Sequence, residues 1–224
     1  MYVFSAKYIC FKPERRNFLK NTKDFYNKTA CEWADKWYKD ETMQPYLAEF
    51  ISYLPRNPKV LDLCCGAGYE SMRMQKLGAN VTGFDFSEES IRIAKERNQD
   101  IQFVVGDMLD DYSFLGKFDG CAVIAGLIHL SNEKLTKAFE RIYEVLYDSG
   151  FLFAVVRDGT GKNLKSSYIS IDGEDYDRDF YLHTLDELKC YSLGKFEFVR
   201  EILFEKESHW KYYIFKKVDC KKVR

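Results

Sequence analysis

The chain has 224 residues and a net charge of −1, with 46% hydrophobic and 31% charged residues. This length suffices for one sizeable domain, and the composition is that of a globular protein rather than a disordered or membrane protein. The near-neutral charge argues against binding that depends on neutralising nucleic-acid phosphates. We therefore expect no nucleic acid and no membrane among its partners.

The seven cysteines are odd in number and form no C-x-x-C pair, which indicates neither a disulfide framework nor a zinc site. Lys7 and Lys12 interrupt the apolar residues of the first segment, so we expect no secretory signal. No apolar run is long enough to cross a bilayer. These features favour a cytoplasmic protein with reduced thiols and no metal.

Apolar and aromatic residues between Asp24 and Leu54 recur at mostly helical spacing, which predicts two helices separated near residues 42–45. From residue 60 the period changes, and short apolar runs alternate with amphipathic segments. We expect strands at 60–64, 81–85, 101–105, 120–125 and 151–156, and helices at 69–77, 88–97 and 133–147. This alternation predicts an α/β fold with a doubly wound, mostly parallel sheet covered by helices on both faces.

After Arg157 a polar, glycine-containing stretch ends near Asp179, and a helix is expected at 185–191. Two strands, 196–204 and 210–218, should pair antiparallel because the link between them is too short for a parallel crossover. The acidic run DGEDYD at 172–177 lacks the terminal glutamate of a calcium loop, so we interpret it as a solvated loop. We expect one domain over residues 21–224, preceded by an extension over 1–20.

The segment VLDLCCGAG, residues 60–68, is a buried strand followed by a glycine turn, where a polar ligand can meet exposed backbone N–H groups. Gly66 and Gly68 would let the ligand approach the backbone, and a tight turn can require positive φ. Asp85 ends the next strand, where a carboxylate can accept hydrogen bonds from ribose hydroxyls. Asp62 suits a cationic ligand, directly or through water. Since Ser71 replaces the last glycine of G-x-G-x-x-G, adenosine joined to a sulfonium amino acid is favoured over a nicotinamide dinucleotide.

Residues 24–157 resemble the class I S-adenosylmethionine-dependent methyltransferases of the small single-domain type. Six segments match in order: FYNKTACEW, VLDLCCGAG, VTGFDFSEESIRIAKER, IQFVVGDMLD, FDGCAVIAGLIHL and IYEVLYDSGFLFAVV. The resemblance implies a Rossmann-like, seven-stranded sheet with an antiparallel C-terminal strand. It also implies S-adenosylmethionine as the cofactor and S-adenosylhomocysteine as the product, with helices in 24–54 forming a lid and 158–181 forming an excursion on the substrate side.

The resemblance implies cofactor-binding roles for residues in several segments: Asp62, Cys64, Gly66 and Gly68 around the methionine part, Asp85 on the ribose, Phe86, Asp107 and Met108 at the adenine, Ala125 at the methionine amino group, and Tyr26 and Trp33 over the site. Asp85 could instead serve the helix N-terminus and Asp107 could cap a turn, although Ser87 already fits the N-cap. Cys64 replaces the family's usual first glycine, which we expect to be tolerated if this position keeps ordinary strand dihedrals.

His129 follows the fourth predicted strand, where the family opens its substrate pocket, and its imidazole could take a proton from an acceptor. The alternative is a loop histidine that packs locally, with Tyr26, His183 and Tyr181 as other candidates. We expect methyl transfer by in-line displacement to an oxygen or nitrogen of a small molecule, by a monomer or homodimer. An RNA or protein methyltransferase and a non-catalytic nucleoside-binding subunit remain alternatives.

Overall fold

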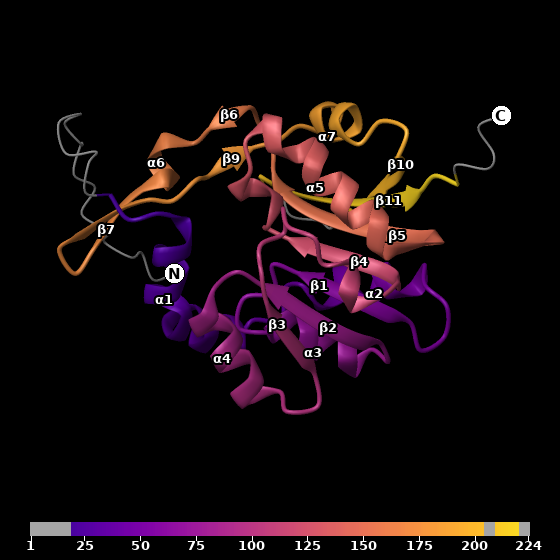
Figure 1. The fold of residues 1–224 in the computed structure, drawn as a ribbon, viewed down its shortest axis with the longest axis horizontal. Helices are drawn as coiled ribbons and strands as arrows, with labels where there is room; N and C mark the ends of the chain where they lie inside the picture. Colours follow the sequence, from indigo (N-terminus) through magenta and orange to yellow (C-terminus); the bar gives the residue numbers. More distant parts are fainter. Residues whose placement is uncertain (1–18, 204–208, 220–224) are drawn as a thin grey trace.

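The computed structural model describes residues 19–203 and 209–219. Seven strands form one sheet in the order β10-β11-β5-β4-β1-β2-β3 (Figure 1). Their bounds are β1 Lys59–Leu63, β2 Asn80–Asp85, β3 Gln102–Val105, β4 Phe118–Ile124, β5 Leu146–Arg157, β10 Phe196–Glu201 and β11 Trp210–Lys217. The first five are parallel, and β11 is antiparallel to both β5 and β10. The predicted mostly parallel sheet with an antiparallel C-terminal strand is confirmed.

Helices cover both faces of the sheet, as expected. The α-helices of the described residues are α1 Thr22–Trp37, α2 Gln44–Ser52, α3 Tyr69–Lys76, α4 Glu88–Arg97, α5 Asn132–Val145, α6 Leu164–Ser167 and α7 Leu185–Tyr191. On one face Phe139 of α5 and Leu188 of α7 are fully buried in the core. On the other, Phe50 of α2, Met74 of α3 and Ile91 of α4 are buried. The helix α1 packs against α4 through small side chains such as Ala30.

The chain runs from β1 to β2 and β3 on one side of β1, and then returns to β4 on its other side. The register pairs Val60 of β1 with Gly120 of β4. Such a reversal of strand order leaves a crevice outside the carboxyl ends of the two strands, where α/β sheets bind ligands. The predicted ligand loop, residues 64–68, follows β1 directly and so lies at this crevice.

The stretch from Gly161 to Leu182 has more regular structure than the sequence indicates. It holds α6 and two small antiparallel pairs: β6 Gly161–Lys162 with β9 Tyr181–Leu182, and β7 Tyr168–Ile171 with β8 Glu174–Asp177. The interpretation of 172–177 as a solvated loop is wrong. Asp172 and Gly173 have φ values of 51° and 80°, as the two-residue turn of a hairpin requires, and Tyr176 of β8 is buried.

The extension expected over residues 1–20 lies outside the described residues, apart from its last two. Lys20 is joined to β8 by backbone hydrogen bonds from its N–H to Asp175 and from Asp177 to its carbonyl. The start of α1 is therefore tied to the β7–β8 hairpin, although about 150 residues separate them in the sequence. In the part of the chain that the structure describes, no helix is long and apolar enough to span a bilayer.

Candidate functional site

A cavity of about 710 Å³ lies at the carboxyl edge of the sheet. This volume is within the usual range for small-molecule and cofactor sites, roughly 300 to 1,000 Å³. Its wall is formed by residues that follow β1, β2, β3 and β4, by one side of α1, and by residues 178–180 of the excursion. The predicted site residues Tyr26, Trp33, Cys64, Gly66, Asp85, Phe86, Asp107, Met108, Ala125 and His129 all line it.

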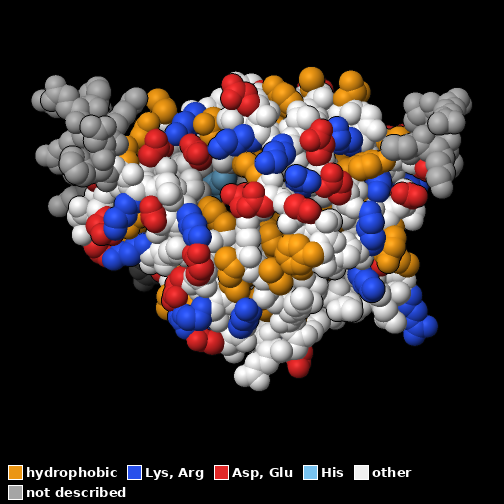
Figure 2. Space-filling view, in the orientation of Figure 1, with side chains coloured by type: hydrophobic (Ala, Val, Ile, Leu, Met, Phe, Trp, Pro, Cys, Tyr) orange, Lys and Arg blue, Asp and Glu red, His pale blue; other side chains and the backbone are white. Residues whose placement is uncertain are grey.

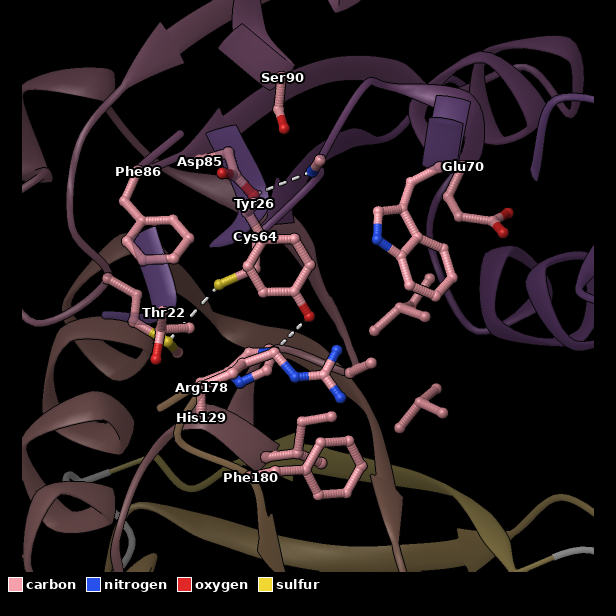
Figure 3. A pocket seen from close by; sticks show the side chains of 18 of the residues that line it. Thr22, Tyr26, Cys64, Glu70, Asp85, Phe86, Ser90, His129, Arg178 and Phe180 are labelled. Atoms are coloured by element: carbon pink, nitrogen blue, oxygen red, sulfur yellow. Dashed lines mark hydrogen bonds between the residues drawn. The ribbon is translucent and has the colours of Figure 1, made fainter. Parts of the chain in front are cut away.

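The loop after β1 makes a tight turn in which Cys64, Gly66 and Gly68 have φ values of 65°, 52° and 80°. Positive φ was expected for the two glycines and is confirmed. Cys64 does not keep ordinary strand dihedrals, contrary to expectation. Because a left-handed conformation costs an L-residue about 1–2 kcal/mol, the usual glycine suits this position for conformational reasons. The Cys64 thiol points toward Met108, with the two sulfurs 3.6 Å apart (Figure 3).

Asp85 connects the loops that follow β1 and β2. Its Oδ2 accepts the N–H of Gly66 at 2.9 Å (Figure 3). Its Oδ1 accepts the N–H of Ser87 at 2.8 Å. Ser87 caps α4 as predicted, accepting the N–H of Ser90. Burial raises the pKa of Asp85 to about 6, against the opposing effect of these backbone donors. Each carboxylate oxygen can still accept a further hydrogen bond from a ligand.

Two predicted residues, Asp62 and Gly68, lie behind the cavity wall rather than on it. Asp62 is 1% exposed, and the Ser71 hydroxyl donates to its Oδ2 at 2.5 Å. Burial raises the pKa of Asp62 to about 7. At Gly68 a Cβ would come within 2.7 Å of the Phe103 ring. The structure therefore explains this glycine by packing and backbone conformation rather than by ligand approach.

The residues on the predicted adenine side come from the ends of β2 and β3. Phe86, Asp107 and Met108 line the cavity there. Asp107 Oδ1 accepts the N–H of Leu109 at 2.8 Å, so this carboxylate caps a turn and still has a second oxygen. Ala125 follows β4 and has a φ of 57°. Its N–H donates to the carbonyl oxygen of Val155 at 3.0 Å.

Tyr26 and His129 form a hydrogen-bonded pair inside the cavity (Figure 3). The Tyr26 hydroxyl lies 2.8 Å from His129 Nε2, and His129 Nδ1 lies 2.6 Å from the carbonyl oxygen of Asp179. Since a carbonyl only accepts, the ring proton sits on Nδ1 and Nε2 accepts from Tyr26. Burial lowers the pKa of His129 to about 4, so the imidazole is neutral. Burial also raises the pKa of Tyr26.

Two of the other proton-acceptor candidates from the sequence, His183 and Tyr181, do not line the cavity. His183 is fully buried and its Nε2 lies 3.1 Å from the carbonyl oxygen of Leu127. Tyr181 is part-exposed in β9 and does not line the wall. His129 is thus the candidate base that lies beside a second functional side chain.

Sequence reasoning missed several charged residues on the cavity wall, among them Glu70 and Arg178. Burial raises the pKa of Glu70 to about 7, and its Oε2 has no hydrogen-bond partner in the described chain. Its other oxygen lies 3.2 Å from Arg73, whose guanidinium also donates to the carbonyls of Trp37 and Asp40. The sequence did offer one sign that Glu70 lies at the site, namely its position two residues after Gly68, the last residue of the glycine turn. Arg178 lies in a segment with no recognisable period.

A family model described as a methyltransferase domain matches residues 60–150. The demethylmenaquinone methyltransferase of Leptospira interrogans is 31% identical over 190 residues, which cover 80% of this chain and 70% of that protein. The chain belongs to the class I S-adenosylmethionine-dependent methyltransferases. S-adenosylmethionine is therefore its cofactor, and the enzyme class expected from the sequence is confirmed.

Solved structures agree with this methyltransferase fold. The magnesium protoporphyrin IX methyltransferase of Synechocystis superposes with a TM-score of 0.67 at 17% identity, covering 87% of this chain and 97% of that one. The 1,6-didemethyltoxoflavin-N1-methyltransferase of Burkholderia thailandensis gives 0.66 at 19% identity, covering 88% and 87%. Some curated relatives match over a shorter stretch. A putative methyltransferase of Bacillus subtilis is 33% identical over 104 residues. The match covers 44% of this chain and 42% of that protein. The chain spans 52% of an O-methyltransferase of Pectobacterium atrosepticum.

Proposed function

We propose that this methyltransferase transfers a methyl group from S-adenosylmethionine to an oxygen or nitrogen atom of a small molecule held in the cavity. The observation that carries the proposal is the Tyr26–His129 pair, which shares one cavity with Asp85 and the glycine turn. The names of relatives support a small acceptor, since demethylmenaquinone, didemethyltoxoflavin and phosphoethanolamine each appear in one. The product would be S-adenosylhomocysteine.

The cavity wall fits the cofactor at each of its parts. Asp85 has free acceptor positions for the two ribose hydroxyls, and Gly66 carries no Cβ that would narrow the cavity next to them. Phe86 and Met108 offer an apolar surface for the adenine ring. The unpartnered Oε2 of Glu70 suits the ammonium group of the methionine part. Asp62 would then support the loop through Ser71 rather than contact the cofactor.

Bound S-adenosylmethionine supplies a methyl group already activated on a sulfonium, so the protein mainly has to align the acceptor and exclude water. Alignment of this kind can supply up to about 7 to 11 kcal/mol. The acceptor O–H or N–H would donate to the Tyr26 oxygen while Tyr26 donates to His129 Nε2. As the acceptor atom bonds to the methyl carbon and the bond from that carbon to sulfur breaks, the acceptor proton passes to Tyr26 and the Tyr26 proton passes to Nε2. The Asp179 carbonyl holds the ring in the tautomer that this transfer needs.

We also propose that α1 and the excursion form the cover of the acceptor site. Besides the backbone contacts of Lys20, the N–H of Asp179 donates to Thr22 Oγ1 at 3.0 Å. Tyr26 of α1 reaches His129 on the far side of the cavity. Opening of one segment would therefore disturb the other.

An RNA acceptor is disfavoured by the net charge of −1 and by the face in Figure 2, where acidic and basic side chains are interspersed. A non-catalytic nucleoside-binding subunit would have no need of the Tyr26–His129 pair. The test is to incubate the protein with S-adenosylmethionine labelled in its methyl group, and with a panel of small alcohols, phenols, amines and carboxylic acids, total tRNA and protein. We expect label in small molecules. Label in tRNA or protein, or cofactor binding without any transfer, would refute the proposal.

A further inference from the structure

Arg178 is a buried cation on the cavity wall between β8 and β9. Only 9% of the surface of Arg178 is exposed, and the residue lines the cavity. Figure 3 shows its guanidinium beside His129 and below the Tyr26 ring, directed into the cavity. The Phe25 and Phe180 rings lie 4.7 and 5.1 Å from the guanidinium carbon. These two aromatic contacts hold the guanidinium in one place.

The charge of Arg178 is not matched by a carboxylate among the described residues. Its Nη2 donates to the carbonyl of Ser166 at 3.1 Å, while its Nε is buried without a partner. The neighbouring acids Asp177 and Asp179 both pair with Lys162 instead, at 2.8 and 3.0 Å. A desolvated charge without an anionic partner costs stability. Such a group is retained where a ligand supplies the missing charge.

The charges on the cavity wall are divided between the two halves of the sheet. The acids Glu70, Asp85 and Asp107 follow β1, β2 and β3, on the side that we assign to the cofactor. The cations Arg157 and Arg178 come from the end of β5 and from the excursion. The acid on that second side, Asp179, is paired with Lys162. An anionic group is therefore favoured at the acceptor end of the cavity.

Apolar and aromatic side chains line much of the same cavity. Phe180 lies against the guanidinium, and Ile128, Val155, Trp210 and Tyr212 are further members of the wall. A planar guanidinium fork matches the two oxygens of a carboxylate, and a single fork suits one such group. Building on the proposed function, we infer that the methyl acceptor is an apolar or aromatic carboxylic acid whose carboxylate binds Arg178.

The test uses matched ligand pairs that differ in charge but hardly in shape: benzoate and benzamide, 4-hydroxybenzoate and 4-hydroxybenzamide, and indole-3-acetate and indole-3-acetamide. Each is titrated calorimetrically into the full chain saturated with S-adenosylhomocysteine, for the unmodified protein, R178Q, R178K and R92Q. Arg92 is exposed on α4 and paired with Glu89 and Glu96, so R92Q removes the same charge outside the cavity.

We expect at least one acid to bind about tenfold or more tightly than its amide in the unmodified protein and in R92Q. The preference should disappear in R178Q and be partly kept in R178K, which retains the charge without the fork. Equal binding of acids and amides by the unmodified protein, including binding of neither, would overturn the inference, as would a preference that survives in R178Q. Failure of S-adenosylhomocysteine to bind the unmodified protein would instead refute the proposed function.

Discussion

The Tyr26 hydroxyl lies 2.8 Å from His129 Nε2, although 103 positions separate the two residues in the chain. The contact joins α1 to η3 (Leu127–His129), the turn that follows β4. The Asp179 carbonyl of the excursion completes the arrangement by fixing the histidine tautomer. Three segments that are distant in sequence therefore meet at one point of the cavity wall, which we propose as the proton-accepting site.

Replacing Tyr26 by phenylalanine should slow methyl transfer without removing the cofactor. Y26F loses the hydroxyl that we propose as the relay for the acceptor proton, so we expect kcat to fall by about 10² to 10⁴. The affinity for S-adenosylhomocysteine should change by no more than about twofold, since the ring is kept. Y147F is the matched control, because Tyr147 is an exposed residue of β5 outside the cavity.

A double variant tests whether Tyr26 and His129 act as one unit. Residues that act together give non-additive effects, so Y26F combined with H129N should be about as slow as the slower single variant. Rates are measured with labelled S-adenosylmethionine at saturating acceptor. Losses that multiply in the double variant would contradict the relay.

The buried carboxylate of Asp62 should make stability depend on pH. Its pKa is raised from 3.8 to about 7, so its protonated form is favoured in the folded state. The contribution of Asp62 to the free energy of unfolding is fully present below about pH 4 and is lost as the pH rises to about 7. Urea denaturation from pH 4.5 to 8 should show the free energy of unfolding of the unmodified protein falling relative to D62N. The expected slope of the difference is about 1.4 kcal/mol per pH unit, and it becomes flat above pH 7.

His129, whose pKa is lowered to about 4, has the opposite effect, since its neutral form is favoured in the folded state and stability is lost as the pH falls from about 6.5 to 4. This effect is common to both proteins and cancels in the difference. Parallel stability curves for the unmodified protein and D62N would show that Asp62 titrates normally.

Gly68 and Gly78 provide a matched pair for separating backbone strain from packing. Both have positive φ, 80° and 93°, but a Cβ would meet Phe103 at Gly68 and open space at Gly78. Both alanine variants should lose stability through the unfavourable φ. G68A should lose about 1–3 kcal/mol more because of overpacking. Equal losses in urea denaturation would show that the contact with Phe103 relaxes without cost.

The sheet could be predicted because its strands are apolar runs separated by helices with regular periods. The bounds of α4 and α7 were correctly predicted, since Ser87 and Thr184 give clear N-cap signals. Most of the predicted site residues line one cavity, because most of them follow a recognisable strand. The topology alone then brings Asp85 beside Gly66.

The acceptor side could not be predicted in the same way. The strands of the excursion have two to four residues, too few for their alternation to stand out from the polar residues around them. The interest of Arg178 depends on tertiary contacts that the sequence does not reveal. These are its packing against the Phe25 and Phe180 rings and the pairing of Asp179 with Lys162. The left-handed conformation of Cys64 was missed because only the usual glycine signals it.

The most direct test of the account is calorimetric titration of S-adenosylhomocysteine into the unmodified protein, D85N and D111N at pH 8, where Asp85 is ionised. Asp111 is an exposed acid outside the cavity whose carboxylate caps Ser113. Loss of charge-assisted hydrogen bonds to the ribose should weaken binding by D85N about 10- to 100-fold, with D111N unchanged. Equal affinity of D85N and the unmodified protein would contradict the assignment of Asp85 to the ribose and, with it, the placement of the cofactor in this cavity.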